Sequence, residues 1–204
     1  MSTNAIRVGT LQMPLPEGWQ QVNSMPDDPP ASVAMATQTQ AGRAFALLYP
    51  MPATYAMPFG NPDAVVGGIH QALAPDQGLV QVEAGTTHAG RAYVYSIVKT
   101  RVEPSGVQYS LTLHVDTGSQ TTCVQAFCDE GQPTGMRDAA VFSALLKAGE
   151  VGEDLSGWQR DPYDPAREEG FLANLSELPE FDHYFPGHPL SLARELVRWA
   201  EEEM

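Results

Sequence analysis

Basic residues are scarce in this sequence and scattered along it. Its 204 residues contain 11 Lys and Arg against 25 Asp and Glu, which gives a formal net charge of −14 at pH 7. Nucleic acids and anionic membrane surfaces bind proteins through clustered Lys and Arg side chains, so neither is expected as a direct partner. Most of the acidity belongs to the last quarter, where residues 150–204 hold 14 acidic residues and 4 arginines.

Long apolar runs and cysteines are also few. No run approaches the roughly 18 apolar residues that a membrane-spanning helix needs, and the first residues do not combine a basic region with an apolar core. The two cysteines, Cys123 and Cys128, would point to opposite faces of a strand that contained both. Two unpaired thiols are typical of a reducing compartment, so we expect a soluble, cytoplasmic protein.

Three successive strands are predicted within Arg91–Cys128. Apolar residues fall on every second position of Val107–Val115, which is the period of a half-buried strand. The run Ala92–Val102 carries apolar residues on both faces and is therefore predicted to be the central strand of a sheet. Thr121–Phe127 gives the third strand, and turn-forming residues separate all three.

Two helices are predicted, one before and one after these strands. Asn61 is the expected N-cap of the first, with Pro62 at its first position. Gly67 and Gly68 weaken that helix by about 1 kcal/mol each relative to alanine, so we expect them to permit close packing on a sheet. The second helix is predicted over Gly135–Lys147. This order of elements indicates an α+β fold, an antiparallel sheet with helices packed on it.

The sequence divides into a predicted α+β domain, residues 1–149, and an acidic linker with a short helical extension, residues 150–204, which docks on it. Within the extension, a short helix is expected over residues 165–175, because Asp-Pro precedes it. An aromatic loop is expected over 181–189. A last helix begins at Pro189 and has one apolar face.

The turn Leu15-Pro-Glu-Gly-Trp19 after a first strand, together with the order of the elements, resembles the PsbP-like superfamily over about residues 5–149. That superfamily includes a photosystem oxygen-evolving subunit, a nuclear import factor that binds the Ran GTPase, and bacterial proteins, some of which are chaperones for secreted effectors. The resemblance implies a non-enzymatic binding or adaptor module. It transfers no catalytic motif, and residues 150–204 fall outside it.

The segment Val115-Asp-Thr-Gly-Ser119 resembles the active-site turn of aspartic proteases, in which two such turns face each other and their carboxylates share a proton. The sequence has one copy, and the residues after it continue a meander. We therefore interpret it as a hairpin turn with Gly118 at a positive φ, and we expect no proteolysis through Asp116.

No other catalytic or metal-binding pattern is present. His183 and His188 with Asp182, or His70 with His88 and His114, lack the spacing of a metal site. A nucleophile elbow, a paired-cysteine motif and a phosphate-binding glycine loop are all missing, so no catalytic residue, metal or cofactor is predicted.

Aromatic residues of the extension are the candidate partner-binding residues. They are Trp158, Phe181, Tyr184, Phe185 and Trp199. Aromatic side chains are enriched at protein interfaces, although these five would also serve to fix the extension to the main domain.

Two functions remain open from the sequence. The first is a cytoplasmic, non-enzymatic adaptor or chaperone-like module that binds another protein through the sheet face or the acidic tail. The second is a small-molecule-binding protein or enzyme with a pocket between the sheet and the C-terminal extension. A closed pocket lined by His, Asp or Arg would favour the second, and an open, apolar sheet face would favour the first. The lack of a clustered acid–base set favours the first. The sequence does not fix the oligomeric state.

Overall fold

The computed structural model describes residues 5–52, 56–118 and 120–204. The strands are β1 (Ala5–Val8), β2 (Leu11–Pro14), β3 (Gln20–Val22), β4 (Val33–Gln38), β5 (Gly42–Met51), β6 (Gln77–Thr86), β7 (Ala92–Arg101), β8 (Val107–Asp116), β9 (Thr121–Glu130), β10 (Gln159–Arg160) and β11 (Ala173–Asn174). The helices are α1 (Pro62–Ala72), α2 (Met136–Ala148) and α3 (Pro189–Glu203), with 3-10 segments η1 (Leu175–Glu177) and η2 (Pro179–Tyr184). The predicted α+β fold is confirmed.

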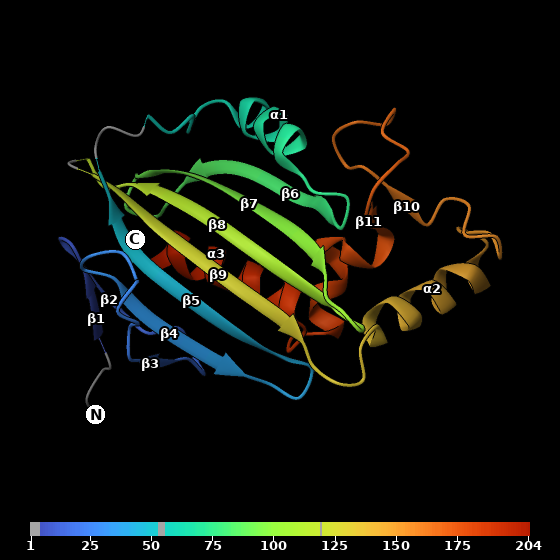
Figure 1. The fold of residues 1–204 in the computed structure, drawn as a ribbon, viewed down its shortest axis with the longest axis horizontal. Coiled ribbons are helices and arrows are strands. Elements are labelled where there is room, and N and C mark those ends of the chain that lie inside the picture. Colours follow the sequence, from blue (N-terminus) through green and yellow to red (C-terminus); the bar gives the residue numbers. More distant parts are fainter. Residues whose placement is uncertain (1–4, 53–55, 119) are drawn as a thin grey trace.

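One antiparallel sheet of seven strands organises the molecule, in the order β3-β4-β5-β9-β8-β7-β6 (Figure 1). The prediction that Ala92–Val102 is the central strand is wrong: this run forms β7, next to the edge strand β6, and β9 is central. The reason is the long-range pairing of β5 with β9, which places the β4–β5 hairpin next to the last strand of the meander, β9. Alternation along a strand does not reveal such a pairing.

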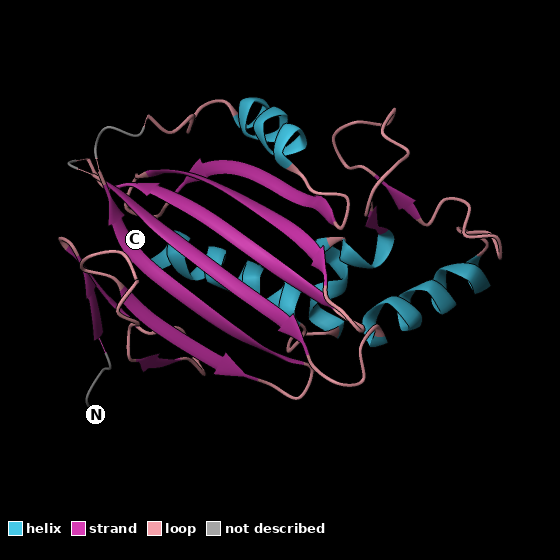
Figure 2. Ribbon diagram, viewed as in Figure 1, coloured by secondary structure: helices cyan, strands magenta, loops and turns pink. Residues whose placement is uncertain are grey.

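Helix α3 covers one face of this sheet. It contacts β5, β8 and β9, and it runs along the far side of the sheet in Figure 2. Leu190 and Leu196 are fully buried there, in one cluster with sheet residues such as Leu111 and Val124. The β1–β2 hairpin closes the same cluster with Ile6. The main core therefore includes the last helix of the chain.

Helix α2 does not pack on the sheet, contrary to the expectation for Gly135–Lys147. It contacts η1 and forms a second, smaller cluster, in which Val141 packs with Val151 and Trp158. Val141, Phe142 and Leu145 form the buried side of α2, but an apolar stripe on a helix does not say which surface it will cover. The expected linker supplies that surface.

Two local expectations also fail. Nothing lies within 4 Å of an added Cβ at Gly67 or Gly68, so these glycines do not bring α1 close to the sheet. Residues 165–175 form turns and then β11 rather than a helix, and the predicted aromatic loop overlaps the end of the 3-10 segment η2. An Asp-Pro start does not sustain a helix where the following residues pack elsewhere.

Buried charges join the C-terminal segment to the rest of the molecule. Lys99 on β7, 1% exposed, lies 2.9 Å from the carboxylate of Glu177, which also accepts a hydrogen bond from Tyr109. Arg137 on α2 donates to the Ser176 carbonyl at 2.7 Å and to Asp182 Oδ1 at 3.0 Å. These groups must stay paired, because an unpaired buried charge is strongly destabilising.

Within the described residues, no helix is both long enough and apolar enough to cross a bilayer.

Candidate functional site

The sheet face that points away from α3 carries the candidate site, and we call it the open face. On it, Phe45 of β5 lies opposite Phe127 of β9, which in turn lies opposite Ser110 of β8. Phe127 is 36% exposed, and Val22 on β3 is 37% exposed. Val22 shares this face with the two phenylalanines, because it pairs with Ala34, and Ala34 pairs with Leu47, two residues from Phe45 on β5. We call Val22, Phe45 and Phe127 the apolar row.

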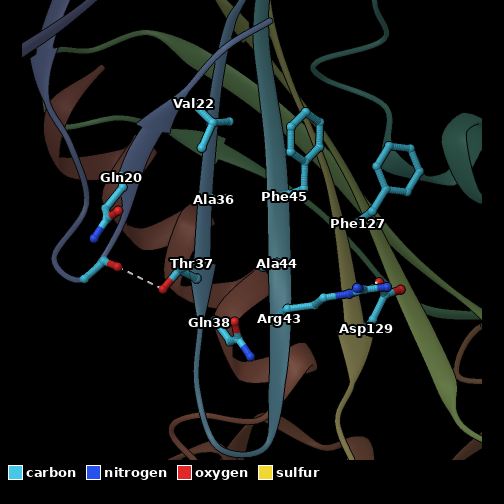
Figure 3. Close-up of a pocket in the computed structure, with 11 residues that line it drawn as sticks. Gln20, Val22, Ala36, Thr37, Gln38, Arg43, Ala44, Phe45, Phe127 and Asp129 are labelled. Atoms are coloured by element: carbon cyan, nitrogen blue, oxygen red, sulfur yellow. Dashed lines mark hydrogen bonds and ion pairs between the residues drawn. The ribbon is translucent and has the colours of Figure 1, made fainter. Parts of the chain in front are cut away.

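A hollow of about 690 Å³ lies over this row (Figure 3). Figure 3 shows the rings of Phe45 and Phe127 projecting from adjacent strands, with Val22 beside them. The hollow is lined by residues of β3, β4, β5 and β9 and by the turn before β3: Gly18, Gln20, Val22, Ala36, Thr37, Gln38, Arg43, Ala44, Phe45, Phe127 and Asp129. It is open to solvent rather than a closed cavity.

A polar row borders the apolar row. Arg43 Nε lies 3.0 Å from Asp129 Oδ2, and Gln108 Nε2 donates to Asp129 Oδ1 at 2.7 Å. Farther along the same row, Gln77 donates to Thr100 at 3.4 Å. Arg43 and Asp129 are the charged residues among those that line the hollow, and they neutralise each other, so the hollow has no net charge.

A second cleft of about 580 Å³ lies between the sheet and the C-terminal extension. At its base Arg194 donates to Gln81 at 2.7 Å and to Asp182 at 2.9 Å, and Gln81 donates to the Tyr95 hydroxyl at 2.7 Å. Burial, followed by the nearby Glu83 carboxylate, raises the pKa of Tyr95 well above its ordinary value. Because these polar groups form hydrogen bonds with one another, their role is to join the sheet to the extension.

The structure separates the five predicted aromatic residues. Trp158 is buried, and Phe181 and Phe185 pack against its cluster, whereas Trp199 lies in the main core. Tyr184 is 68% exposed and stands against the ring of His183. A role of these residues in partner binding stays a prediction, and only Tyr184 of the five presents a largely exposed ring.

The protease-like turn is a hairpin turn between β8 and β9. Asp116 Oδ1 accepts a hydrogen bond from the Gly118 N–H at 2.8 Å, and Gly118 has φ +84°, as the turn requires. Ser119 lies outside the described residues. The Asp116 side chain is used locally to stabilise the turn.

The histidines do not gather. His188 is buried and caps α3, His183 is exposed, and His70 lies 3.1 Å from Asp161. His114 is partly buried on the open face, and burial lowers its pKa. Among the residues that the structure places, no three His, Cys, Asp or Glu side chains are arranged to hold a metal ion.

Both cysteines lie on β9, buried on opposite faces, and both are free thiols. Burial raises the pKa of the Cys128 thiol to about 12 and raises that of Cys123 as well. A thiol with a raised pKa is a poor nucleophile at neutral pH.

Sequence reasoning missed Phe45 and Phe127. In β5 apolar residues occupy both faces, and in β9 Phe127 was counted only as a strand-forming residue. The signal that joins them is the β5–β9 register, which places them directly opposite each other. That register depends on the tertiary structure.

No protein-family model matches the sequence, and neither does any curated protein. Among solved structures, cyanobacterial PsbP (CyanoP) from Synechocystis sp. PCC 6803 is similar at a TM-score of 0.38 and 12% identity, covering 67% of this chain and 83% of that chain. The protein of unknown function PA94 from Pseudomonas aeruginosa is similar at a TM-score of 0.35 and 13% identity, covering 70% and 92%. This is a remote likeness that says nothing of function, and membership of the PsbP-like superfamily stays a prediction.

Proposed function

We propose that this protein is a non-enzymatic, adaptor or chaperone-like module of the cytoplasm that binds part of another polypeptide on its open face. The observation that carries this proposal is the apolar row, in which Val22 and Phe127 are exposed and Phe45 is half-buried, set beside a neutral polar row under an open hollow. Aromatic residues with a polar border are typical of protein-binding surfaces. The two free, buried thiols fit a reducing compartment.

Site-specific cross-linking tests the proposal. A photoreactive phenylalanine analogue replaces Phe127 in one full-length variant and Tyr184 in another, and both are expressed in the native host. We expect the Phe127 position to cross-link a discrete polypeptide and the Tyr184 position to give little of it, since Tyr184 is exposed but lies outside the hollow. Equal cross-linking at both positions, or none at either, would contradict the proposal.

The cross-linked polypeptide then allows a binding measurement. Phe127→Ser should weaken its binding by more than about tenfold, because truncating a central aromatic hot-spot residue costs about 2 kcal/mol or more. Tyr184→Ser is the matched control and should leave the affinity unchanged. Circular dichroism of both variants shows whether the fold is kept.

The cleft beside Arg194 supports a second candidate, a small-molecule-binding function between sheet and extension. Its specific observation is the 580 Å³ volume with Tyr95 and Asp182 among the lining residues. A thermal-shift screen with small amines and carboxylates tests it. A stabilising compound whose effect disappears in Glu83→Gln, at the cleft rim, would favour this candidate over the first.

A further inference from the structure

The two edge strands of the sheet, β6 and β3, differ in how far other parts of the chain cover their backbone, and this difference suggests how a partner is bound. We infer that the edge strand β3 accepts an extended segment of the partner as an additional strand, next to the hollow of the open face. The inference rests on the proposed function, because it specifies the conformation in which the partner is bound.

The β6 edge is blocked. The Tyr163 hydroxyl lies 2.5 Å from the backbone nitrogen of Val82 and 3.0 Å from its carbonyl oxygen, so it satisfies both outward-facing groups of that residue. Helix α1 and strand β11 also contact β6. A bulge beside Leu79 further disturbs the edge. Proteins commonly protect a long edge strand in these ways, because its free N–H and C=O groups can pair with another chain.

The β3 edge has no such cover among the described residues. All three residues of β3 are exposed, and their backbone pairs with β4 alone. In antiparallel pairing, part of the backbone groups of an edge strand point outward, where only water or a further strand satisfies them. The side chains Gln20, Gln21 and Val22 carry no charge that would repel an added strand.

The position of β3 joins this edge to the hollow. Gln20 and Val22 both line it, and Figure 3 shows them to one side of Phe45 and Phe127. A strand added beside β3 would point every second side chain toward the open face, because successive side chains of a strand lie on opposite faces of the sheet. Backbone hydrogen bonds would then supply affinity and the open face would select apolar side chains at alternate positions.

Charge decides between a foreign segment and a second copy of this chain. Two copies would each carry a net charge of −14, most of it in residues 150–204, and this overall charge opposes self-association. The same charge attracts a basic segment and does not repel a neutral one. The expected occupant is therefore an extended segment of another protein, with apolar residues at alternate positions and without net negative charge.

A synthetic peptide tests this with the full-length protein. The probe is a short, capped peptide in which threonine alternates with valine and phenylalanine, with a lysine at each end. Two further versions carry N-methyl groups on alternate residues, one on each edge of the extended peptide. We expect binding to protect β3 amides from hydrogen exchange. One N-methylated version should bind about tenfold more weakly and the other should bind like the parent, since only one edge faces β3.

The outcomes separate this inference from the proposed function. If the peptide protects no β3 amide and both N-methylated versions bind like the parent, strand addition is overturned. If Phe127→Ser also abolishes that binding, the open face remains the binding site. Absence of binding by the parent peptide also overturns strand addition, while the cross-linking at Phe127 still decides the proposed function. A dimer in sedimentation that Gln21→Lys dissociates would identify a second copy as the occupant and would overturn the foreign segment.

Discussion

Trp199 connects the last helix to the N-terminal hairpin. Its ring is buried in the main core, and its Nε1 donates a hydrogen bond to the Pro14 carbonyl on β2 at 3.1 Å. Truncation removes both the packing and this bond, so Trp199→Ala should lower the free energy of unfolding by about 3 kcal/mol. Chemical denaturation measures it. Tyr184→Ala is the control, with an expected change within about 0.5 kcal/mol, and an unchanged midpoint for Trp199→Ala would contradict the docking of α3.

Thr122 on β9 has a fully buried hydroxyl with no hydrogen-bond partner among the described residues. Burying an unpaired hydroxyl is costly, and valine has nearly the same shape. Thr122→Val should therefore raise the free energy of unfolding by roughly 1 kcal/mol. Thr87 is the matched control, since its buried hydroxyl accepts a bond from the Arg91 N–H at 3.2 Å, and Thr87→Val should destabilise instead. Equal effects in the two variants would refute the explanation.

At the scale of elements, Glu130 and His188 link the end of β9 to the start of α3, because Glu130 is the last residue of β9 and His188 caps α3. His188 Nδ1 accepts the Leu190 N–H at 3.2 Å and caps the helix, while Nε2 lies 3.4 Å from Glu130. Burial raises the pKa of Glu130, but the bonds from His188 and from the backbone N–H groups of Gly135 and Val107 outweigh it and lower the pKa below its ordinary value.

This lowered pKa predicts an acid-dependent contribution to stability. A carboxyl group whose pKa is lower in the folded state stabilises the fold above its unfolded pKa, about 4.3 for glutamate, and the contribution disappears as the pH falls through the folded value. Glu130→Gln should thus lose most stability near neutral pH, and its difference from the parent should shrink below about pH 4. Urea denaturation across this range checks it, with the exposed Glu153→Gln as control. A difference that is constant with pH would rule out the linkage.

At the scale of the whole molecule, α3 makes the last residues part of the main core. Leu190, Leu192 and Leu196 are buried among sheet residues, and each fully buried side chain contributes about 1.5 to 3 kcal/mol before entropy losses. The division of the chain at residue 149 into a domain and an extension stays a prediction. We expect a fragment 1–149 to lose the cooperative unfolding transition, because one sheet face would meet water. A fragment that unfolds near the midpoint of the full chain would show that the sheet is stable without α3.

Local chemistry made the elements predictable. The Asn61 side chain accepts the Ala64 N–H at 3.2 Å, as its N-cap position indicated, and Gly149 ends α2 at φ +77°. The alternation of Val107–Val115 became β8. Each of these signals is contained in a few neighbouring residues, where backbone preferences and capping act. Such signals carry no information about which distant surface an apolar face will meet.

By itself, the sequence determined the strands of the meander, the start of α1, the extent of α2 to within a residue at each end, the acidic character and the opposite facing of the two cysteines. The tertiary structure alone decided that β9 is central, that α3 rather than α2 covers the sheet, and that Phe45 meets Phe127. It also decided that Lys99, on an unremarkable strand position, is buried against Glu177. The reason is physical: strand order and helix docking depend on the total apolar surface removed from water and on pairing every buried charge, and both are sums over residues far apart in the chain.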